Sequence, residues 1–329
     1  MKYPDDFVNQ IIQGDALEIL KQMPNEVVNT IITSPPYWGL RDYGVEGQIG
    51  LEKTPEEYVE KLVNIFREAR RILKKTGTLW LNLGDSYAGA PAGNKGHIKN
   101  ELFSAGSKGE NYRDNLKQAS QVKKNAFKYN GLKPKDLVGI PWRVAFALQQ
   151  DGWYLRQDII WAKPNPMPES VKDRCTKSHE YIFLLSKSPK YYFDNEAIKE
   201  PISESYAKDK RPHGIIRERF YPNSKYVKEG LMDLQTGEFP TQPRSETRNK
   251  RDVWWITTKP FKGAHFATFP EDLVEPMILA GCPQEGIVLD PFMGSGTTAV
   301  VAKKLGRNYI GIELNPKYIQ LAEERIKTI

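Results

Sequence analysis

The chain has 329 residues, 39% of them hydrophobic and 27% charged, which fits a soluble globular protein with room for one large and one smaller domain. The formal net charge of +7 favours a polyanionic partner. Two distant cysteines argue against a disulfide framework, and together with four scattered histidines they argue against a metal site. The lack of a signal-peptide core argues against export, and the lack of a bilayer-length apolar run argues against a membrane partner. A cytoplasmic protein is therefore expected.

The first predicted elements are a strand at residues 8–13 and a helix at residues 16–23. Asp15 lies at the corner between them, where it can cap the helix or accept a hydrogen bond from the amino group of a ligand. The apolar run at residues 27–32 is typical of a buried strand in a parallel sheet.

A proline turn follows that strand, with Ser34, Pro35, Pro36 and Tyr37 in succession. The prolines end the strand because they cannot donate to a neighbouring strand, and the carboxyl ends of strands are where α/β proteins bind ligands. The serine hydroxyl, the free carbonyls and the aromatic ring suit a flat ring that carries an amino group. Taken alone, the same residues also fit a purely structural turn capped by buried aromatic side chains.

Beyond this turn, a glycine-rich loop at residues 39–50 is expected to close over a substrate. A helix from Thr54, with proline at its first position, to Lys75 and a strand at residues 78–83 then complete a βαβ pattern. Residues 88–135 are predicted to form a basic flexible insertion, which is either solvated surface or a flap that contacts phosphates.

The middle of the chain returns to regular elements and then changes again. A helix is predicted at residues 141–150, and strands at 153–163 and 180–186 are joined by a proline-rich extended loop. Residues 195–251 mix basic, aromatic and amide side chains, as base-edge and phosphate contacts require, although a bland polar insertion is the alternative.

The last part of the chain contains a second turn of interest. A helix is predicted at 270–280, a strand at 286–289, a helix at 299–305, a strand at 308–312 and a final helix from Asn315. The glycine turn at residues 290–297 lacks the lysine of a P-loop and the GxGxxG spacing, so a nucleotide triphosphate is disfavoured. Its helix N–H groups can hold a carboxylate, Asp290 can attract an ammonium, and Glu313 can accept ribose hydroxyls, which together fit S-adenosylmethionine.

The proline turn and the glycine turn together resemble the amino-directed DNA methyltransferases of the permuted β-type, in which the catalytic half precedes the cofactor half. The resemblance covers roughly residues 1–87, 136–194 and 252–329. It implies an α/β, Rossmann-like methyltransferase domain formed by 1–194 and 252–329, with a mostly parallel twisted sheet, helices on both faces and a circularly permuted motif order. Residues 195–251 become the target recognition region.

The resemblance also assigns roles to individual residues. It implies that Asp15 contacts the cofactor adenine, that Glu313 accepts the ribose hydroxyls, and that the methionine-binding loop comprises Asp290, Phe292, Gly294, Gly296 and Thr297. The segment with His265, Thr268 and Phe269 resembles the one that closes the methionine end of the cofactor site. The segment around His179, Glu180 and Tyr181 resembles one near the target base, for which structural packing is an equal explanation.

The expected catalytic residues are Ser34, Pro35, Pro36 and Tyr37, acting on a base flipped out of double-stranded DNA. In the family, serine at the first motif position usually accompanies cytosine N4 and an acid or amide accompanies adenine N6, so we predict cytosine N4 with adenine N6 as the alternative. A cytosine carbon-5 enzyme is rejected because Cys282 precedes a proline instead of following one. A cognate restriction endonuclease and association with the prokaryotic nucleoid are expected; a protein or RNA methyltransferase and a non-catalytic DNA-binding relative remain alternatives.

Overall fold

The computed structural model describes residues 1–89, 131–202, 246–258 and 269–329. Two units are distinguished by their internal contacts, one formed by Met1–Ala197 with Arg251–Ile329 and the other by Ile198–Lys250. Most of the predicted insertion at 88–135 and of the predicted target recognition region at 195–251 therefore lies outside the described residues, and both assignments stay predictions.

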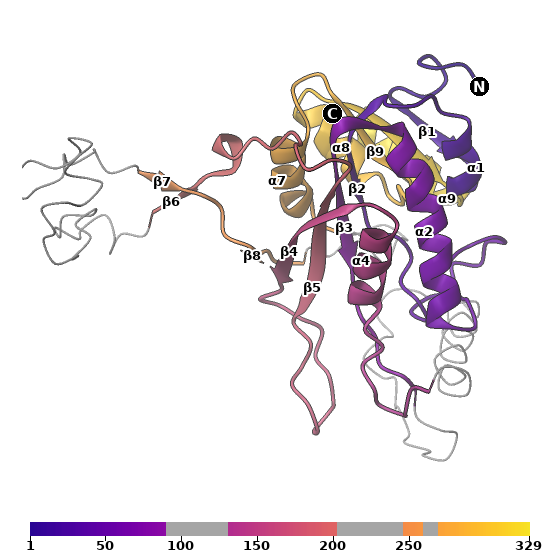
Figure 1. Ribbon diagram of the computed structural model, residues 1–329, viewed down its shortest axis with the longest axis vertical. Coiled ribbons are helices and arrows are strands. Elements are labelled where there is room, and N and C mark those ends of the chain that lie inside the picture. Colours follow the sequence, from indigo (N-terminus) through magenta and orange to yellow (C-terminus); the bar gives the residue numbers. More distant parts are fainter. Residues whose placement is uncertain (90–130, 203–245, 259–268) are drawn as a thin grey trace, which may run out of the picture. The chain divides into compact units, whose positions relative to one another are not determined.

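The larger unit is built on one eight-stranded sheet (Figure 1). In sheet order its strands are β1 (Gln10–Gln13), β10 (Asn308–Glu313), β9 (Ile287–Asp290), β2 (Val28–Thr33), β3 (Leu73–Leu83), β5 (His179–Ser186), β4 (Tyr154–Ala162) and β8 (Val253–Trp255). Adjacent strands are parallel except at β5, which runs antiparallel to both β3 and β4. The sheet is thus mostly parallel, as predicted.

Helices cover both faces of the sheet. One layer contains α1 (Ala16–Lys21), α2 (Pro55–Ile72) and α4 (Ile140–Gln150), and the other contains α7 (Glu271–Gly281), α8 (Thr297–Lys304) and α9 (Pro316–Lys327). Side chains alternate between the layers because successive residues of a strand face opposite sides. Ile31 and Leu79 join the core beneath α1, α2 and α4, whereas the Trp80 indole lies against Gly281 of α7.

The junction between α2 and β3 differs from the prediction. The helix ends at Ile72 and the strand begins at once with Leu73, whereas the helical pattern predicted continuation to Lys75 and a strand from residue 78. Leu73 is fully buried and pairs with Val28 of β2, so strand pairing overrides the local helical pattern. The other predicted elements are present, with ends shifted by no more than two residues.

The parallel strands bring distant segments to one edge. β1, β10, β9 and β2 are consecutive neighbours and run in the same direction, so their carboxyl ends lie together. Asp15, the glycine turn and the proline turn lie at the ends of β1, β9 and β2, and Glu313 is the last residue of β10. This is the edge at which open α/β sheets bind ligands.

The smaller unit contributes one described strand pair. β6 (Glu200–Pro201) and β7 (Thr247–Arg248) are antiparallel, and the Arg248 guanidinium lies 3.0 Å from the Glu200 carboxylate. A short 3-10 helix, η1 (Glu196–Ile198), belongs to the larger unit except for its last residue, which is the first of the smaller unit. In the described part of the chain, no helix is both long and apolar enough to cross a bilayer.

Candidate active site

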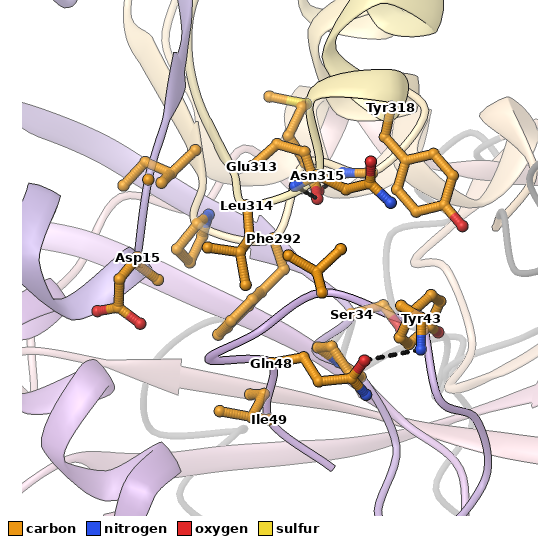
Figure 2. Close-up of a pocket in the computed structure, with 18 of the residues that line it drawn as sticks. Asp15, Ser34, Tyr43, Gln48, Ile49, Phe292, Glu313, Leu314, Asn315 and Tyr318 are labelled. Carbon is orange, nitrogen blue, oxygen red and sulfur yellow. Dashed lines mark hydrogen bonds between the residues drawn. The ribbon is translucent and has the colours of Figure 1, made fainter. Parts of the chain in front are cut away.

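A single pocket collects both turns at the carboxyl edge of the sheet (Figure 2). Ser34 and Pro36 of the proline turn line it together with Phe292, Gly294 and Thr297 of the glycine turn. The remaining wall comes from the corner after β1, the loop at residues 43–49, α2, Phe269, the end of β10 and the start of α9, and includes Asp15, Tyr43, Gln48, Ile49, Ile65, Glu313, Leu314, Asn315 and Tyr318. Segments about 260 positions apart in sequence thus face the same space.

Two acids form fixed polar points on this wall. Asp15 caps α1 by accepting a hydrogen bond from the backbone N–H of Glu18 at 3.1 Å, and it also lines the pocket; its predicted contact with the amino group of a ligand stays a prediction. Glu313 accepts from the backbone N–H of Gly294 and from that of Asn315, each at 2.8 Å. Burial raises the pKa of Glu313, and the two backbone donors hold its carboxylate against the glycine turn.

Asp290 has a different position from the one expected for an ammonium ligand. Its side chain is 1% exposed and does not line the pocket. It accepts hydrogen bonds from the Thr33 hydroxyl at 2.6 Å, the Thr298 hydroxyl at 2.7 Å and the Phe292 backbone N–H at 3.0 Å. Burial raises the pKa of Asp290 to about 6. This geometry makes Asp290 the residue that ties β2, β9 and α8 beneath the turn.

Gly296 also serves the packing of the turn and does not line the pocket. Its φ of +81° lies in the left-handed region, and an added Cβ would lie 2.6 Å from the Ala322 Cβ of α9. Only glycine allows α8 to begin this close to α9. Of the segment predicted to close the methionine end, Phe269 lines the pocket, and His265 and Thr268 lie outside the described residues.

Tyr37 does not line this pocket; it is half-buried beside Ser34 and is held by side chains from two other strands. The Ser34 hydroxyl donates to Tyr37 Oη at 3.3 Å. Tyr37 Oη in turn lies 2.8 Å from Glu180 Oε2 and 3.0 Å from Asn82 Oδ1. One ring edge packs against Gly84, where an added Cβ would lie 2.5 Å from Tyr37 Cε2. Burial and the charge of Glu180 raise the pKa of Tyr37 well above its ordinary value, so the phenol keeps its proton.

The other residues of the proline turn are also engaged. The Pro36 carbonyl accepts a hydrogen bond from Tyr58 Oη of α2 at 2.9 Å, and the Trp38 indole N–H donates to the Glu52 carbonyl at 3.0 Å. Pro35 is buried and does not line the pocket. The turn is therefore a rigid corner with Ser34 at the pocket surface.

A family model described as DNA methylase, of the N6/N4 type, matches residues 28–324. The chain belongs to the N6/N4 DNA methylase family. This methylase is 46% identical over 317 residues to the Type II methyltransferase M.Cfr9I of Citrobacter freundii, covering 96% of this chain and 87% of the relative. It is also 46% identical over 322 residues to the Type II methyltransferase M.SmaI of Serratia marcescens, covering 96% and 90%.

Solved structures share the fold of this methylase. The PvuII DNA methyltransferase (cytosine-N4-specific) superposes with a TM-score of 0.59 at 18% identity, covering 96% of this chain and 85% of that one. A putative DNA modification methylase of Thermus thermophilus, complexed with S-adenosyl-L-methionine, superposes with a TM-score of 0.57 at 22% identity, covering 98% and 94%. The predicted Rossmann-like methyltransferase fold is thus confirmed.

S-adenosylmethionine is the methyl donor of this family, and the pocket of this methylase fits it. Ile49, Ile65 and Phe292 supply apolar surface for a flat purine, and Glu313 supplies a carboxylate that suits ribose hydroxyls. The described residues contain no group of three or more His, Cys, Asp or Glu side chains that could hold a metal ion.

Several residues of this wall were not among those predicted from the sequence. Gln48 braces the loop, because its Oε1 accepts from the Tyr43 backbone N–H at 2.7 Å and its Nε2 donates to the Arg41 carbonyl at 3.3 Å. The ring of Tyr43 meets that of Tyr318 edge-on, with centroids 6.4 Å apart. The only signal for this part of the wall was the glycine-rich composition of the loop, which does not say which side chains turn inward.

Proposed function

We propose that this methylase transfers a methyl group to the exocyclic N4 of a cytosine flipped out of duplex DNA, as the modification enzyme of a Type II restriction–modification system. The observation that carries the proposal is the presence of Ser34 in the same pocket as Glu313 and the glycine turn. When bound, S-adenosylmethionine supplies a methyl group already activated by its sulfonium centre. The permuted order of the catalytic and cofactor segments belongs to the same proposal.

The proline turn acts on the amino group of the base. An aromatic amine is a weak nucleophile because its lone pair is delocalised into the ring. The Ser34 hydroxyl already donates to Tyr37, so its lone pairs are available to accept one N–H of the amine. We assign the other N–H to the Pro35 carbonyl, since the Pro36 carbonyl is taken by Tyr58; because Pro35 does not line the cofactor pocket, this assignment places the base beside that pocket and not within it. These two acceptors favour a pyramidal nitrogen whose lone pair points along the line of attack.

The same corner holds the base once it has left the helix. Flipping a base costs roughly a few kcal/mol, and contacts in the pocket must offset this. We assign the Tyr37 ring to stack on the flipped base, because its phenol is fixed by hydrogen bonds and one ring edge is fixed by Gly84. No strong base is required, because an N-methylated aromatic ammonium is itself very acidic.

DNA recognition is assigned to two segments that lie mostly outside the described residues. Residues 195–251 are proposed as the target recognition region and residues 88–135 as a flap that contacts phosphates, because both are rich in lysine and arginine. The Type II relatives support a cognate restriction endonuclease as a partner in the cell.

The base and the atom are tested by product analysis. Duplex DNA treated with the enzyme and S-adenosylmethionine is digested to nucleosides and analysed by mass spectrometry, with Ser34→Ala as the matched control. N4-methylcytosine is the expected product, and N6-methyladenine alone would overturn the assignment. Transfer to duplex RNA or peptide at a higher rate than to DNA would overturn the substrate class.

A further inference from the structure

Three side chains that the proposed function does not use converge on Tyr37 behind Ser34. Asn82 lies near the end of β3, Glu180 at the start of β5 and Lys163 directly after β4. Because β5 lies between β3 and β4, with Asn82 opposite Ile182 and Trp161 opposite Glu180, the sheet brings these residues to one place at Tyr37.

The Glu180 carboxylate is fully engaged by donors. Its Oε2 lies 2.8 Å from Tyr37 Oη and accepts from Asn82 Nδ2 at 3.2 Å, and its Oε1 pairs with Lys163 Nζ. Asn82 is itself fixed by donating to the Tyr181 carbonyl at 3.1 Å, and Lys163 Nζ lies 4.1 Å from the centroid of the Trp161 ring. Glu180 and Lys163 are each only 17% exposed, so this is a stationary negative charge in a partly desolvated site.

The direction of the hydrogen bonds follows from this charge. Tyr37 has one phenolic proton, and a carboxylate is a stronger acceptor than the amide oxygen of Asn82. With the proton directed at Glu180, Tyr37 Oη presents a lone pair to Ser34, which donates to it. The Ser34 oxygen is then left with lone pairs for the pocket.

We infer that Glu180 is a positioning residue for methyl transfer, which acts through Tyr37 to present Ser34 to the target amine as a hydrogen-bond acceptor. The inference rests on the proposed role of Ser34. The negative charge of Glu180, transmitted through the hydrogen bonds of Tyr37 and Ser34, also stabilises the positive charge that the amine nitrogen gains during transfer. No proton moves along the chain in this step, and Lys163 serves to hold the carboxylate in place.

Glu180→Gln tests the inference because it removes the negative charge while it keeps the shape of the side chain. Lys163 can only donate, so it selects the amide oxygen and turns the amide NH2 toward Tyr37. Tyr37 would then accept from residue 180, and its own proton would turn to Asn82 Oδ1, 3.0 Å away, or to Ser34. In both cases the negative charge behind the Ser34 oxygen is lost, and in the second case the Ser34 proton also opposes the N–H of the amine.

The measurement is the single-turnover rate of methyl transfer from a preformed complex of enzyme, S-adenosylmethionine and target duplex. We expect Glu180→Gln to slow transfer about tenfold or more, with dissociation constants for cofactor and DNA within about twofold of wild type. Tyr37→Phe, which removes only the phenol oxygen, should also slow transfer. In the Tyr37→Phe background, Glu180→Gln should have almost no further effect.

Glu68→Gln is the matched control, since it breaks a partly buried carboxylate–arginine pair on α2, with 2.7 Å between Glu68 and Arg71, away from the site. It should leave the transfer rate unchanged. Multiplicative losses in the double variant, or wild-type rates in Tyr37→Phe, would overturn the inference. Tyr37→Phe decides the matter if Glu180→Gln does not fold. The identity of the methylated base is read separately, in the wild-type product. A different base there would overturn the proposed function and leave this inference standing, whereas unchanged transfer rates in the variants would overturn this inference alone.

Discussion

The proline turn and the glycine turn both follow buried strands at the same edge of the sheet, and each is held by a carboxylate, but they are held differently. Asp290 binds the glycine turn through neutral donors only, two hydroxyls and a backbone N–H. Glu180 binds the side chain of Tyr37 and is paired with the positive charge of Lys163. The first arrangement holds the backbone next to the cofactor pocket, and the second holds a side chain next to the reacting amine. Substitutions in the two turns should therefore have different effects on stability, binding and methyl transfer.

The largest effect is expected for the packing of the glycine turn. Gly296→Ala places a Cβ at 2.6 Å from the Ala322 Cβ in a left-handed backbone conformation, which should lower the free energy of unfolding by about 2–4 kcal/mol. Gly44→Ala is the control, because Gly44 also has a positive φ but an added Cβ there meets nothing within 4 Å. Denaturant unfolding of both variants measures the difference, and equal losses would show that the contact with α9 does not constrain the turn.

Asp290 should give the glycine turn a dependence on pH. Burial raises the pKa of Asp290 to about 6 in the folded chain, above the value of about 4 for an unfolded aspartate. The folded state therefore binds the proton more tightly, and its stability should fall as the pH rises from about 4 to about 6, by up to about 3 kcal/mol. Asp290→Asn should remove this part of the pH dependence in unfolding measurements, while Asp5→Asn at an exposed position retains it; a pH profile unaltered by Asp290→Asn would contradict the assignment.

The proline turn is tested by a substitution that removes stacking. Tyr37→Ala should weaken binding of the flipped base by about 1–3 kcal/mol and leave cofactor affinity nearly unchanged. Tyr43→Ala removes an aromatic ring from the cofactor side of the pocket and should show the opposite pattern. Titrations with S-adenosylmethionine and with target duplex separate the two, and a loss of cofactor affinity in Tyr37→Ala would show that Tyr37 is misassigned.

A smaller loss is expected for the ribose acceptor. Glu313→Gln keeps the size of the side chain but replaces a charged acceptor by a neutral amide. The amide NH2 would also face one of the two backbone N–H groups that donate to the Glu313 carboxylate. We expect the dissociation constant for S-adenosylmethionine to rise roughly tenfold, or about 1.4 kcal/mol, measured by calorimetry. Single-turnover transfer at saturating cofactor should stay close to wild type, and a large drop there would place Glu313 in the chemistry.

The smallest effect per substituted residue is expected in the basic region at residues 195–251, on the affinity for DNA. Replacing Lys208, Arg211 and Arg217 together by glutamine should flatten the dependence of DNA affinity on salt, by about 0.9 in slope for each phosphate that is no longer neutralised. The slope is measured by titrating duplex DNA at several salt concentrations. An unchanged slope would place the DNA backbone away from residues 195–251.

Much of the fold and of the pocket could be predicted from the sequence because both depend on local patterns. Apolar runs and capping residues located the strands and helices, and strand-ending turns placed Ser34, Glu313 and Phe292 at one edge. The orientation of Asp290 could not be predicted, because an acid at the end of a strand has the same sequence signal whether it faces the ligand or the core. The convergence of Tyr37, Glu180 and Lys163 depends on the register of β3, β5 and β4, which local patterns do not encode.

The passage from α2 into β3 has a consequence for how the catalytic corner can change. This stretch contacts the corner at both of its ends, through Tyr58 on the Pro36 carbonyl and through Asn82 on Tyr37. The register of β3 against β2 shifts between Leu73 and Thr78 and is regular from Thr78 onward, so extra residues are already absorbed close to the joint with α2. A residue inserted after Thr78 would turn every later side chain of β3 to the opposite face and move Asn82 away from Tyr37, so homologous enzymes that keep this corner should accept length variation in their loops and between Leu73 and Thr78 but not in this part of β3.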